Sequence, residues 1–211
     1  VAVLAALAAL DAAVPWIPDV VQEAHPLSVP IIMVGQAGNK SAPCTALPDV
    51  IGWRKLCKGG TTMPFLMIRN DITKVAADAI VNPANRNLLQ GSGTSRAIYQ
   101  AAGKQELTAA CEAIGRCELG RAVCTPAFRL PAKYIFHAVC PAWHGGGFGE
   151  AEQLAGAYHS ALELAAEYHC ESVAFPLLSS GNYGYPKEQA FRIAVDTITQ
   201  YVMEHDLTVY L

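Results

Sequence analysis

The 211-residue chain is long enough for one full domain and a smaller additional piece. Its hydrophobic content of 52%, with only 16% charged residues, excludes a disordered protein and indicates a compact domain with a substantial core. A net charge of −3 argues against general binding to DNA or RNA through a basic face, so nucleic acid is not an expected partner.

The cysteine and histidine patterns favour neither a disulfide framework nor a metal site. The seven cysteines are odd in number and no two have C-x-x-C spacing, and the six histidines form no H-x-x-x-H pair. Several cysteines lie in apolar runs, where a free thiol acts as a small hydrophobic group. We therefore expect a reducing, cytoplasmic location, no metal and no cofactor. The cysteines are Cys44, Cys57, Cys111, Cys117, Cys124, Cys140 and Cys170.

The first 62 residues differ in pattern from the rest of the chain. Val1–Val14 predicts a helix, Asp19–Ala24 its continuation and Val29–Val34 a strand. The apolar start is too short to cross a bilayer and has no basic flank, so no membrane association is expected. One helix and one strand bury little area alone. We predict an extension or fusion remnant of unassigned role over residues 1–62, followed by a domain over residues 63–211.

Residues 35–60 read as a loop rich in Gly, Pro, Ser and Lys. Within them, Gly35–Ser41 is superficially similar to a phosphate-binding P-loop. That motif requires glycine directly before its lysine, and Asn39 occupies this place. We therefore interpret the segment as a plain loop.

From Met63 onward, apolar strand-like runs alternate with segments of helical periodicity. Such alternation predicts an α/β domain with a mixed or parallel sheet that is covered on both sides by helices. Strands are expected at Phe65–Arg69, Ala79–Asn82, Ala122–Thr125, Tyr134–Val139, Val173–Leu177 and Thr208–Leu211, and helices at Ser95–Ala102, Lys104–Ile114, Glu150–Tyr168 and Lys187–Glu204.

Two glycine-rich segments, each between an apolar strand and a predicted helix, are the most informative feature of the chain. The first is Leu89–Ser95 and the second lies within Val173–Pro186. Backbone amides of such turns and the N-terminus of the next helix can hold phosphate. Since ligands of open α/β sheets gather at the carboxyl ends of strands, the two segments predict a ligand with two phosphates, held from both sides.

Polar residues near these segments each have a structural and a functional interpretation. Asp71 can accept a hydrogen bond from an exocyclic amine such as that of adenine, but from the residues alone we favour a turn cap shared with Thr73. Asn82 and Asn85 can bind sugar hydroxyls or stabilise turns. Tyr183 can cover a ribose or pack as a lid. Four glycines can take positive φ and allow close approach of a ligand: Gly91, Gly93, Gly181 and Gly184.

Other polar residues have mainly structural interpretations. Asp78 and Glu150 are expected to serve as turn or helix-start residues. His137 and Cys140 lie on a predicted buried strand and are expected to be core residues with satisfied hydrogen bonds.

Five strings carry a family resemblance, in the family's own order: NDIT (70–73), DAIVNPAN (78–85), GSGTSRAIYQAAG (91–103), LPAKYIFHAVCPAW (130–143) and SVAFPLLSSGNYGYP (172–186). On these strings, residues 63–211, about 70% of the chain, resemble the macro domain, a module that binds ADP-ribose. The resemblance implies a three-layer α/β/α sandwich with a mixed, largely parallel sheet, which agrees with the α/β class expected above.

The resemblance also implies roles for individual residues. Asp71, with Ile72 beside it, would bind the adenine amine, while Asn85 and Tyr183 would lie against the distal ribose. Backbone amides of the two glycine-rich loops would hold the diphosphate. An adenine-stacking aromatic that the family often supplies after the last strand would fall beyond Leu211. The expected ligand-binding residues are Asp71, Ile72, Asn82, Asn85, Gly91, Gly93, Thr94, Ser95, Ser179, Ser180, Gly181, Asn182, Tyr183 and Gly184.

One departure from the family pattern concerns catalysis. Hydrolytic members read G-G-G-V-D-G-A-I, and the Asp orients or activates the attacking water. Here the stretch reads GSGTSRAI, which places Ser95 at the Asp position and Arg96 where a small residue is usual. Serine cannot act as a carboxylate base at neutral pH, and losing a general base commonly costs ~10²–10⁴-fold in rate. Arg96 either reaches the diphosphate or points to solvent.

Three hypotheses follow. In the first, the chain binds ADP-ribose or mono-ADP-ribosylated protein and hydrolyses the ribose C1″ linkage or an acyl ester without metal, with Asn85 and Ser95 as the catalytic candidates. In the second, it is a non-catalytic ADP-ribose reader, because Ser95 replaces the usual Asp. In the third, it binds another ligand, such as an RNA end or a different nucleotide diphosphate.

Overall fold

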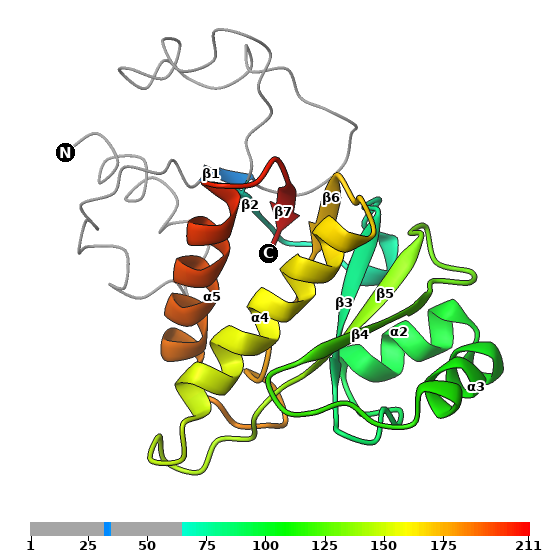
Figure 1. Cartoon of the computed structure of the whole chain (residues 1–211), viewed down its shortest axis with the longest axis horizontal. Coiled ribbons are helices and arrows are strands. Elements are labelled where there is room, and N and C mark those ends of the chain that lie inside the picture. Colours follow the sequence, from blue (N-terminus) through cyan, green and yellow to red (C-terminus); the bar gives the residue numbers. More distant parts are fainter. Residues whose placement is uncertain (1–31, 35–64) are drawn as a thin grey trace, which may run out of the picture.

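The computed structural model of the chain describes residues 32–34 and 65–211 (Figure 1). The predicted helix at Val1–Val14, the segment Asp19–Ala24 and the loop over residues 35–60, with its P-loop-like stretch, lie outside the described residues. Within the described residues, no helix is both long and apolar enough to cross a membrane.

The described part is built around a seven-stranded mixed sheet with the strand order β1-β2-β7-β6-β3-β5-β4. Every neighbouring pair is parallel except β4 with β5, which is antiparallel. The strands are β1 (Ile32–Val34), β2 (Phe65–Ile68), β3 (Ala79–Ala84), β4 (Ala122–Pro126), β5 (Tyr134–Val139), β6 (Ser172–Ala174) and β7 (Thr208–Tyr210).

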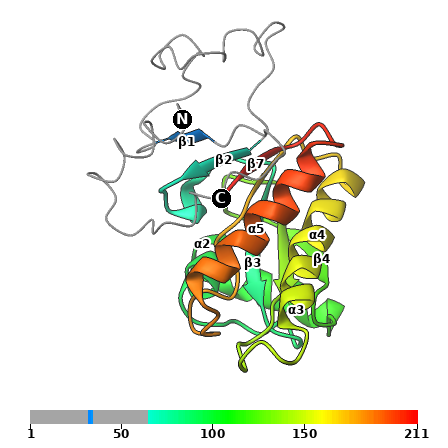
Figure 2. The same ribbon diagram turned by 90° about the vertical axis from the view of Figure 1, so that its left-hand side faces the viewer.

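Helices cover both faces of the sheet, which gives the predicted three-layer α/β/α sandwich (Figures 1 and 2). Because side chains alternate along a strand, Val81 of β3 points to one face and Ile80 to the other. Val81 joins the hydrophobic core formed with α4 (Glu150–Glu167) and α5 (Lys187–Val202). Ile80 joins a second core formed with α2 (Thr94–Ala102) and α3 (Lys104–Ile114).

The expected strand at Val173–Leu177 is shorter than predicted, since β6 comprises only Ser172–Ala174. The Phe175 N–H still donates to Tyr210 O at 2.7 Å, but Pro176 has no N–H with which to continue the ladder. The Leu178 N–H then donates to the Tyr158 hydroxyl at 2.9 Å instead of to a strand. The apolar run is therefore half strand and half loop.

Strand β3 is longer than predicted and includes Pro83. Proline is tolerated there because β6 pairs only with the start of β3, at Ala79 and Ile80, so that Pro83 has β5 as a neighbour but not β6. The extension carries the strand to Ala84, directly before the first glycine-rich segment.

The strand predicted at Val29–Val34 is present in part as β1, which pairs in parallel with β2. Three residues of the N-terminal segment thus belong to the same sheet as the predicted domain. The division of the chain at residues 62 and 63 stays a prediction.

Candidate ligand-binding site

The two glycine-rich segments emerge from one edge of the sheet. Loop 1 (residues 85–93) connects β3 to α2, and loop 2 (residues 175–186) connects β6 to α5. Because β3 and β6 are parallel neighbours, both loops leave from carboxyl ends of strands, at the lower edge of the sheet in Figure 1. A hydrogen bond from Asn182 Nδ2 to Ser92 Oγ joins the two loops, although these residues are 90 positions apart. The fold therefore brings the two predicted segments together.

Asn85 holds loop 1 in shape through its own carboxamide. Its Oδ1 accepts hydrogen bonds from the N–H groups of Asn87 and Leu89, both at 3.1 Å, and its Nδ2 donates to Leu89 O at 2.7 Å. The turn-stabilising interpretation of Asn85 is thus correct. One hydrogen on Nδ2 is left for another partner, because an amide nitrogen carries two.

Gly91 and Gly93 of loop 1 are suited to their positions for different reasons. Gly93 has φ 57° and ψ −127°, which is accessible in practice only to glycine, and it directly precedes α2. Gly91 does not have the positive φ that was considered for it, but a Cβ there would lie 3.3 Å from Ser95 Cβ. Gly91 is therefore placed by close packing against α2, while Gly93 is required by the backbone turn.

Ser95 lies in the first turn of α2 and is almost completely buried. Its hydroxyl accepts a hydrogen bond from the Gly91 N–H at 3.2 Å, so the side chain closes loop 1 onto the helix. Thr94, the first residue of α2, is half-buried, and Arg96 is exposed. The first N–H groups of any α-helix have no acceptor within the helix, so this end of α2 offers donors to an anion.

Loop 2 is held by contacts with the rest of the molecule and with itself. The buried Ser179 donates its hydroxyl to Pro141 O at 2.8 Å, and Ser180 donates to Leu177 O at 2.8 Å. Gly184, with φ 67°, donates its N–H to Gly181 O at 2.9 Å and closes a turn. Gly181, like Gly91, does not have a positive φ.

Tyr183 contacts the base of loop 1 from loop 2. Its hydroxyl lies 3.5 Å from Ala84 O, a long hydrogen bond, and its ring is half-buried. The Trp143 N–H donates to Tyr183 O at 2.8 Å, and the Trp143 and Tyr185 rings pack with centroids 4.6 Å apart. The segment after β5 therefore runs beside loop 2.

Asp71 caps the short 3-10 helix η4 (Ile72–Lys74) that follows β2. Its Oδ1 accepts from the Thr73 hydroxyl at 2.8 Å and from the Thr73 N–H at 3.1 Å. These two bonds, with Lys74 3.7 Å from Oδ2, hold the pKa of the Asp71 carboxyl below its ordinary value. Ile72 packs against the core on the α2 face. The turn cap shared with Thr73, which the residues alone favoured, is present.

Asn82 lies beneath loop 1 and is buried on the α2 side of the sheet. Its Nδ2 is 3.0 Å from His137 Nδ1, and its Oδ1 has no hydrogen-bond partner among the described residues. His137 Nε2 lies 2.9 Å from the Thr125 hydroxyl. Burial lowers the pKa of His137 to about 4, so the ring is neutral at physiological pH. His137 is the satisfied core residue that was expected.

Glu150, the first residue of α4, organises the loop that precedes it. Its carboxylate accepts hydrogen bonds from the N–H groups of His144, Gly146 and Phe148 at 3.0, 3.1 and 2.7 Å. Burial opposes ionisation, but these donors outweigh it and lower the pKa of Glu150 to about 2. The helix-start role expected for Glu150 is confirmed.

Asp78, which was expected to be a turn or helix-start residue, makes long-range hydrogen bonds instead. Its Oδ2 accepts from the Glu171 N–H at 2.8 Å and from the Ser172 N–H at 3.2 Å. It therefore ties the start of β3 to the start of β6, the two strands that lead into the ligand loops.

Two nucleophilic side chains near the loops, the Cys140 thiol and the Ser95 hydroxyl, are both engaged in hydrogen bonds. Cys140 follows β5 and donates its thiol to Ala138 O at 3.1 Å, and burial raises its pKa to about 12. A thiol in this state does not form the reactive thiolate at neutral pH. The Ser95 hydroxyl accepts the Gly91 N–H and, among the described residues, makes no hydrogen bond to a carboxylate that could activate it. The backbone amides of the loops are therefore the groups best suited to bind an anion here.

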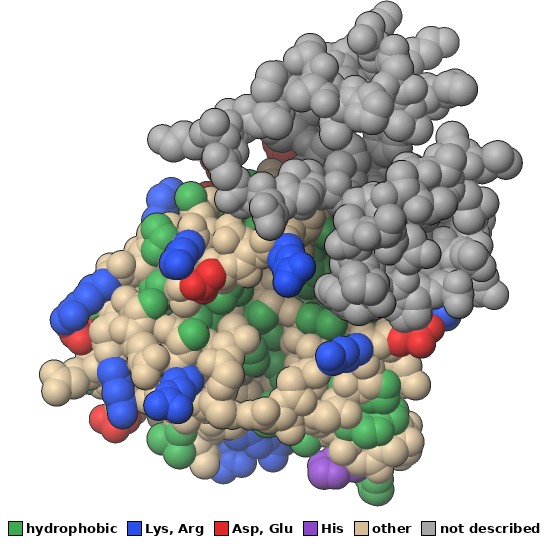
Figure 3. All heavy atoms as spheres, turned by 180° about the vertical axis from the view of Figure 1, so that it is seen from behind, with side chains coloured by type: hydrophobic (Ala, Val, Ile, Leu, Met, Phe, Trp, Pro, Cys, Tyr) green, Lys and Arg blue, Asp and Glu red, His purple; other side chains and the backbone are tan. Residues whose placement is uncertain are grey.

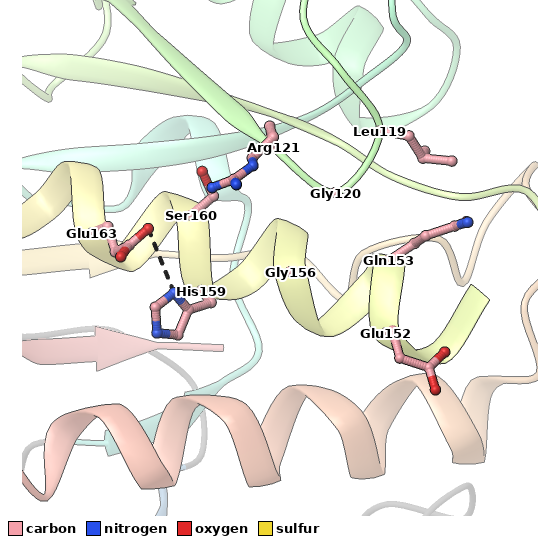
Figure 4. A pocket seen from close by; sticks show the side chains of 9 residues that line it. All are labelled: Leu119, Gly120, Arg121, Glu152, Gln153, Gly156, His159, Ser160 and Glu163. Carbon is pink, nitrogen blue, oxygen red and sulfur yellow. Dashed lines mark ion pairs between the residues drawn. The ribbon is translucent and has the colours of Figure 1, made fainter. Parts of the chain in front are cut away.

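A separate hollow of about 410 Å³ lies between the Leu119–Arg121 turn and α4 (Figure 4). Gly156 of α4 allows the close approach, because a Cβ there would meet Gly120 O at 3.0 Å. Figure 4 shows His159 and Glu163 forming an ion pair on one side, with Arg121 near Ser160. None of the residues that line this hollow belongs to loop 1 or loop 2.

Seen from behind, the described part shows hydrophobic side chains near its middle, with Lys and Arg side chains and also Asp and Glu side chains around them (Figure 3). Basic and acidic side chains are thus mixed on this face, as the small net charge of −3 suggests.

Several residues that shape the site were not singled out from the sequence. Ser92 lies inside the predicted segment, but its bond to Asn182 has no local signature. Tyr99 and Tyr158 read as ordinary core positions of amphipathic helices, and their contacts with the loops come from tertiary packing.

The fold and the paired loops define an α/β protein with a candidate ligand site at the carboxyl edge of a mostly parallel sheet. A model of the Macro domain family matches residues 81–194. A macro domain-containing protein of Chlorobaculum tepidum is 50% identical over 133 residues, which cover 63% of this chain and 77% of the relative. The chain belongs to the macro domain family.

Two further similarities carry functional names. An O-acetyl-ADP-ribose deacetylase of Salmonella gallinarum is 46% identical over 150 residues, which cover 69% of this chain and 83% of the relative. The crystal structure of a Trypanosoma brucei macrodomain in complex with ADP-ribose superposes with a TM-score of 0.65 at 31% identity, covering 73% of this chain and 66% of that one.

Proposed function

We propose that this protein binds ADP-ribose, free or attached to protein, with the diphosphate between loop 1 and loop 2. The observation that carries the proposal is the meeting of the two loops at the carboxyl edge of the sheet, joined by Ser92 and Asn182. Loop 1 ends at the N-terminus of α2, where backbone N–H groups suit a phosphate. The relatives named for ADP-ribose chemistry and ADP-ribose binding support the same ligand.

We assign the parts of ADP-ribose to individual side chains from their positions around the two loops. Asp71, with Ile72, takes the adenine amine, and the free Nδ2 hydrogen of Asn85 takes a hydroxyl of the distal ribose. Tyr183 covers that ribose, and Asn82 supports the site from below loop 1. The remaining loop residues, Gly91, Gly93, Thr94, Ser95, Ser179, Ser180, Gly181, Asn182 and Gly184, form the diphosphate cradle.

We further propose that the protein is primarily a reader with little turnover. Ser95 replaces the carboxylate of hydrolytic relatives, and its hydroxyl already accepts the Gly91 N–H. The second candidate is slow, metal-independent hydrolysis of the ribose C1″ linkage or of an acyl ester of ADP-ribose, which the relative named O-acetyl-ADP-ribose deacetylase favours. Positioning of water by the bound substrate would then supply most of the rate.

Calorimetric titration with ADP-ribose tests binding, and product analysis with mono-ADP-ribosylated protein and O-acetyl-ADP-ribose tests turnover. Binding without product supports the reader, and binding with product supports the slow hydrolase. Absence of any heat at high protein concentration would overturn the proposal. AMP, ADP and short RNA in parallel titrations show whether the distal ribose and both phosphates are required.

A further inference from the structure

Two completely buried tyrosines reach the two ligand loops from opposite faces of the sheet. Tyr99 lies on α2 and belongs to the core on the α2 and α3 face. Tyr158 lies on α4 and belongs to the core on the α4 and α5 face. The Tyr99 hydroxyl donates to Leu88 O of loop 1 at 2.7 Å, and the Tyr158 hydroxyl accepts the Leu178 N–H of loop 2 at 2.9 Å.

At both contacts the loop backbone adopts a left-handed conformation at a residue other than glycine. Leu88 has φ 54°, and Ser179, which directly follows Leu178, has φ 61°. Such residues persist only where the surrounding contacts determine the conformation strongly. The tyrosine hydroxyls are contacts of this kind, because each joins a strained turn to a rigid helix.

The surroundings keep both hydroxyls in place. Burial raises the pKa of Tyr99 and of Tyr158, so each phenol stays protonated. The Cys111 Sγ on α3 lies 3.2 Å from the Tyr99 hydroxyl and restricts it from the other side. The Tyr158 ring packs against Phe175, at the start of loop 2, with centroids 5.3 Å apart.

We propose that Tyr99 and Tyr158 are positioning residues that hold loop 1 and loop 2 in their ligand-binding shape before a ligand arrives. Each tyrosine acts on its own loop from its own face of the sheet. Their effects on ligand affinity therefore multiply, as expected for independent sites. The affinity part of this inference rests on the proposed binding of ADP-ribose, whereas the ordering of the loops does not.

The experiment uses Tyr99→Phe, Tyr158→Phe and the double variant in the full chain. Each substitution removes one hydroxyl and keeps the ring in its core. Tyr201→Phe is the matched control, since Tyr201 is also buried but lies near the end of α5 that is remote from loop 2. The first readout is amide hydrogen exchange of the protein without ligand, and the second is affinity for ADP-ribose.

We expect Tyr99→Phe to speed exchange in residues 88–93 only and Tyr158→Phe in residues 178–184 only, with Tyr201→Phe changing neither. ADP-ribose affinity should fall by roughly 5-fold in each single variant and by roughly 25-fold in the double one, as for loss of one hydrogen bond each. Unchanged loop exchange, or faster exchange spread evenly over the whole protein, would overturn the inference. Failure of the wild-type protein to bind ADP-ribose would overturn the proposed function instead, because the exchange result decides the role of the tyrosines by itself.

Discussion

Asn82 of β3 and His137 of β5 occupy directly opposed positions in the sheet, and their side chains meet 3.0 Å apart in the core beneath loop 1. Both are almost fully buried, and burial keeps the imidazole neutral. This polar pair links the neighbouring strands β3 and β5 directly beneath loop 1. It also makes the stability of the fold dependent on pH.

The buried His137 predicts a loss of stability in mildly acidic solution. Its pKa is lowered from 6.5 to about 4, so the unfolded chain takes up a proton that the folded chain refuses. The contribution of His137 to the free energy of unfolding is complete above pH 6.5. It is lost as the pH falls toward 4, and the free energy of unfolding is lower by about 3 kcal/mol at pH 4. Urea denaturation at pH 7, 6, 5 and 4 measures this slope. His137→Gln should be less stable at pH 7 and should lack this part of the slope; a variant that retains the whole slope would contradict the assignment.

Glu150 should stabilise the His144–Gly149 segment through its charge. Glu150→Gln keeps the size of the side chain but removes the anion that accepts three backbone N–H groups, so we expect a lower melting temperature and faster amide exchange at His144, Gly146 and Phe148. In the wild-type protein, the contribution of the Glu150 carboxylate to stability is complete above pH 4.5 and is lost as the pH falls toward 2. Glu152→Gln, at an exposed position of the same helical turn, is the control. Equal effects of the two substitutions would refute this role.

Asn85 should be more important for the shape of loop 1 than its exposed neighbour Asn87. Asn85→Ala removes three hydrogen bonds within the loop, and we expect a loss of about 1–2 kcal/mol in the free energy of unfolding together with weaker ADP-ribose binding. Asn85→Asp keeps the acceptor for the two N–H groups and should be milder in stability. Asn87→Ala is the control. If Asn85→Ala lowers affinity with no effect on stability, the residue acts on the ligand alone.

The backbone of loop 1 should tolerate no side chain at Gly93. Gly93→Ala forces alanine into φ 57° and ψ −127°, and we expect a cost of about 1–3 kcal/mol in stability and a lower affinity for ADP-ribose. Gly181→Ala is a matched control, since both positions are exposed with open space around a Cβ and only Gly93 has a positive φ. Thermal denaturation and calorimetry measure both effects. Similar losses of affinity in the two variants, without a difference in stability, would show that crowding of the ligand, rather than the backbone conformation, is responsible.

Because Ser95 stands where hydrolytic members have Asp, introducing a carboxylate at this position should raise hydrolytic activity. Ser95→Asp places a carboxylate in the first turn of α2 beside Gly91, and we expect hydrolysis of mono-ADP-ribosylated protein to rise by ~10²-fold or more, as for restoring a general base. Ser95→Asn, of similar shape but without charge, should leave turnover at the wild-type level. Release of ADP-ribose is followed by chromatography under single-turnover conditions. No gain with Asp, in a variant that still binds ADP-ribose, would mean that loop 1 cannot place the water.

The sequence by itself determined the alternation of strands and helices, the two loops and the family, because these depend on local periodicity and on short strings. It also predicted the turn cap at Asp71, since Thr73 lies two residues away. It did not predict which glycine needs a positive φ, and it extended strand β6 to Leu177, although β6 ends at Ala174. Only the tertiary structure decided that Asn82 meets His137, that Ser92 meets Asn182 and that Tyr99 and Tyr158 reach the loops. These contacts join residues far apart in the chain or on different layers, and no local pattern encodes the packing that aligns them.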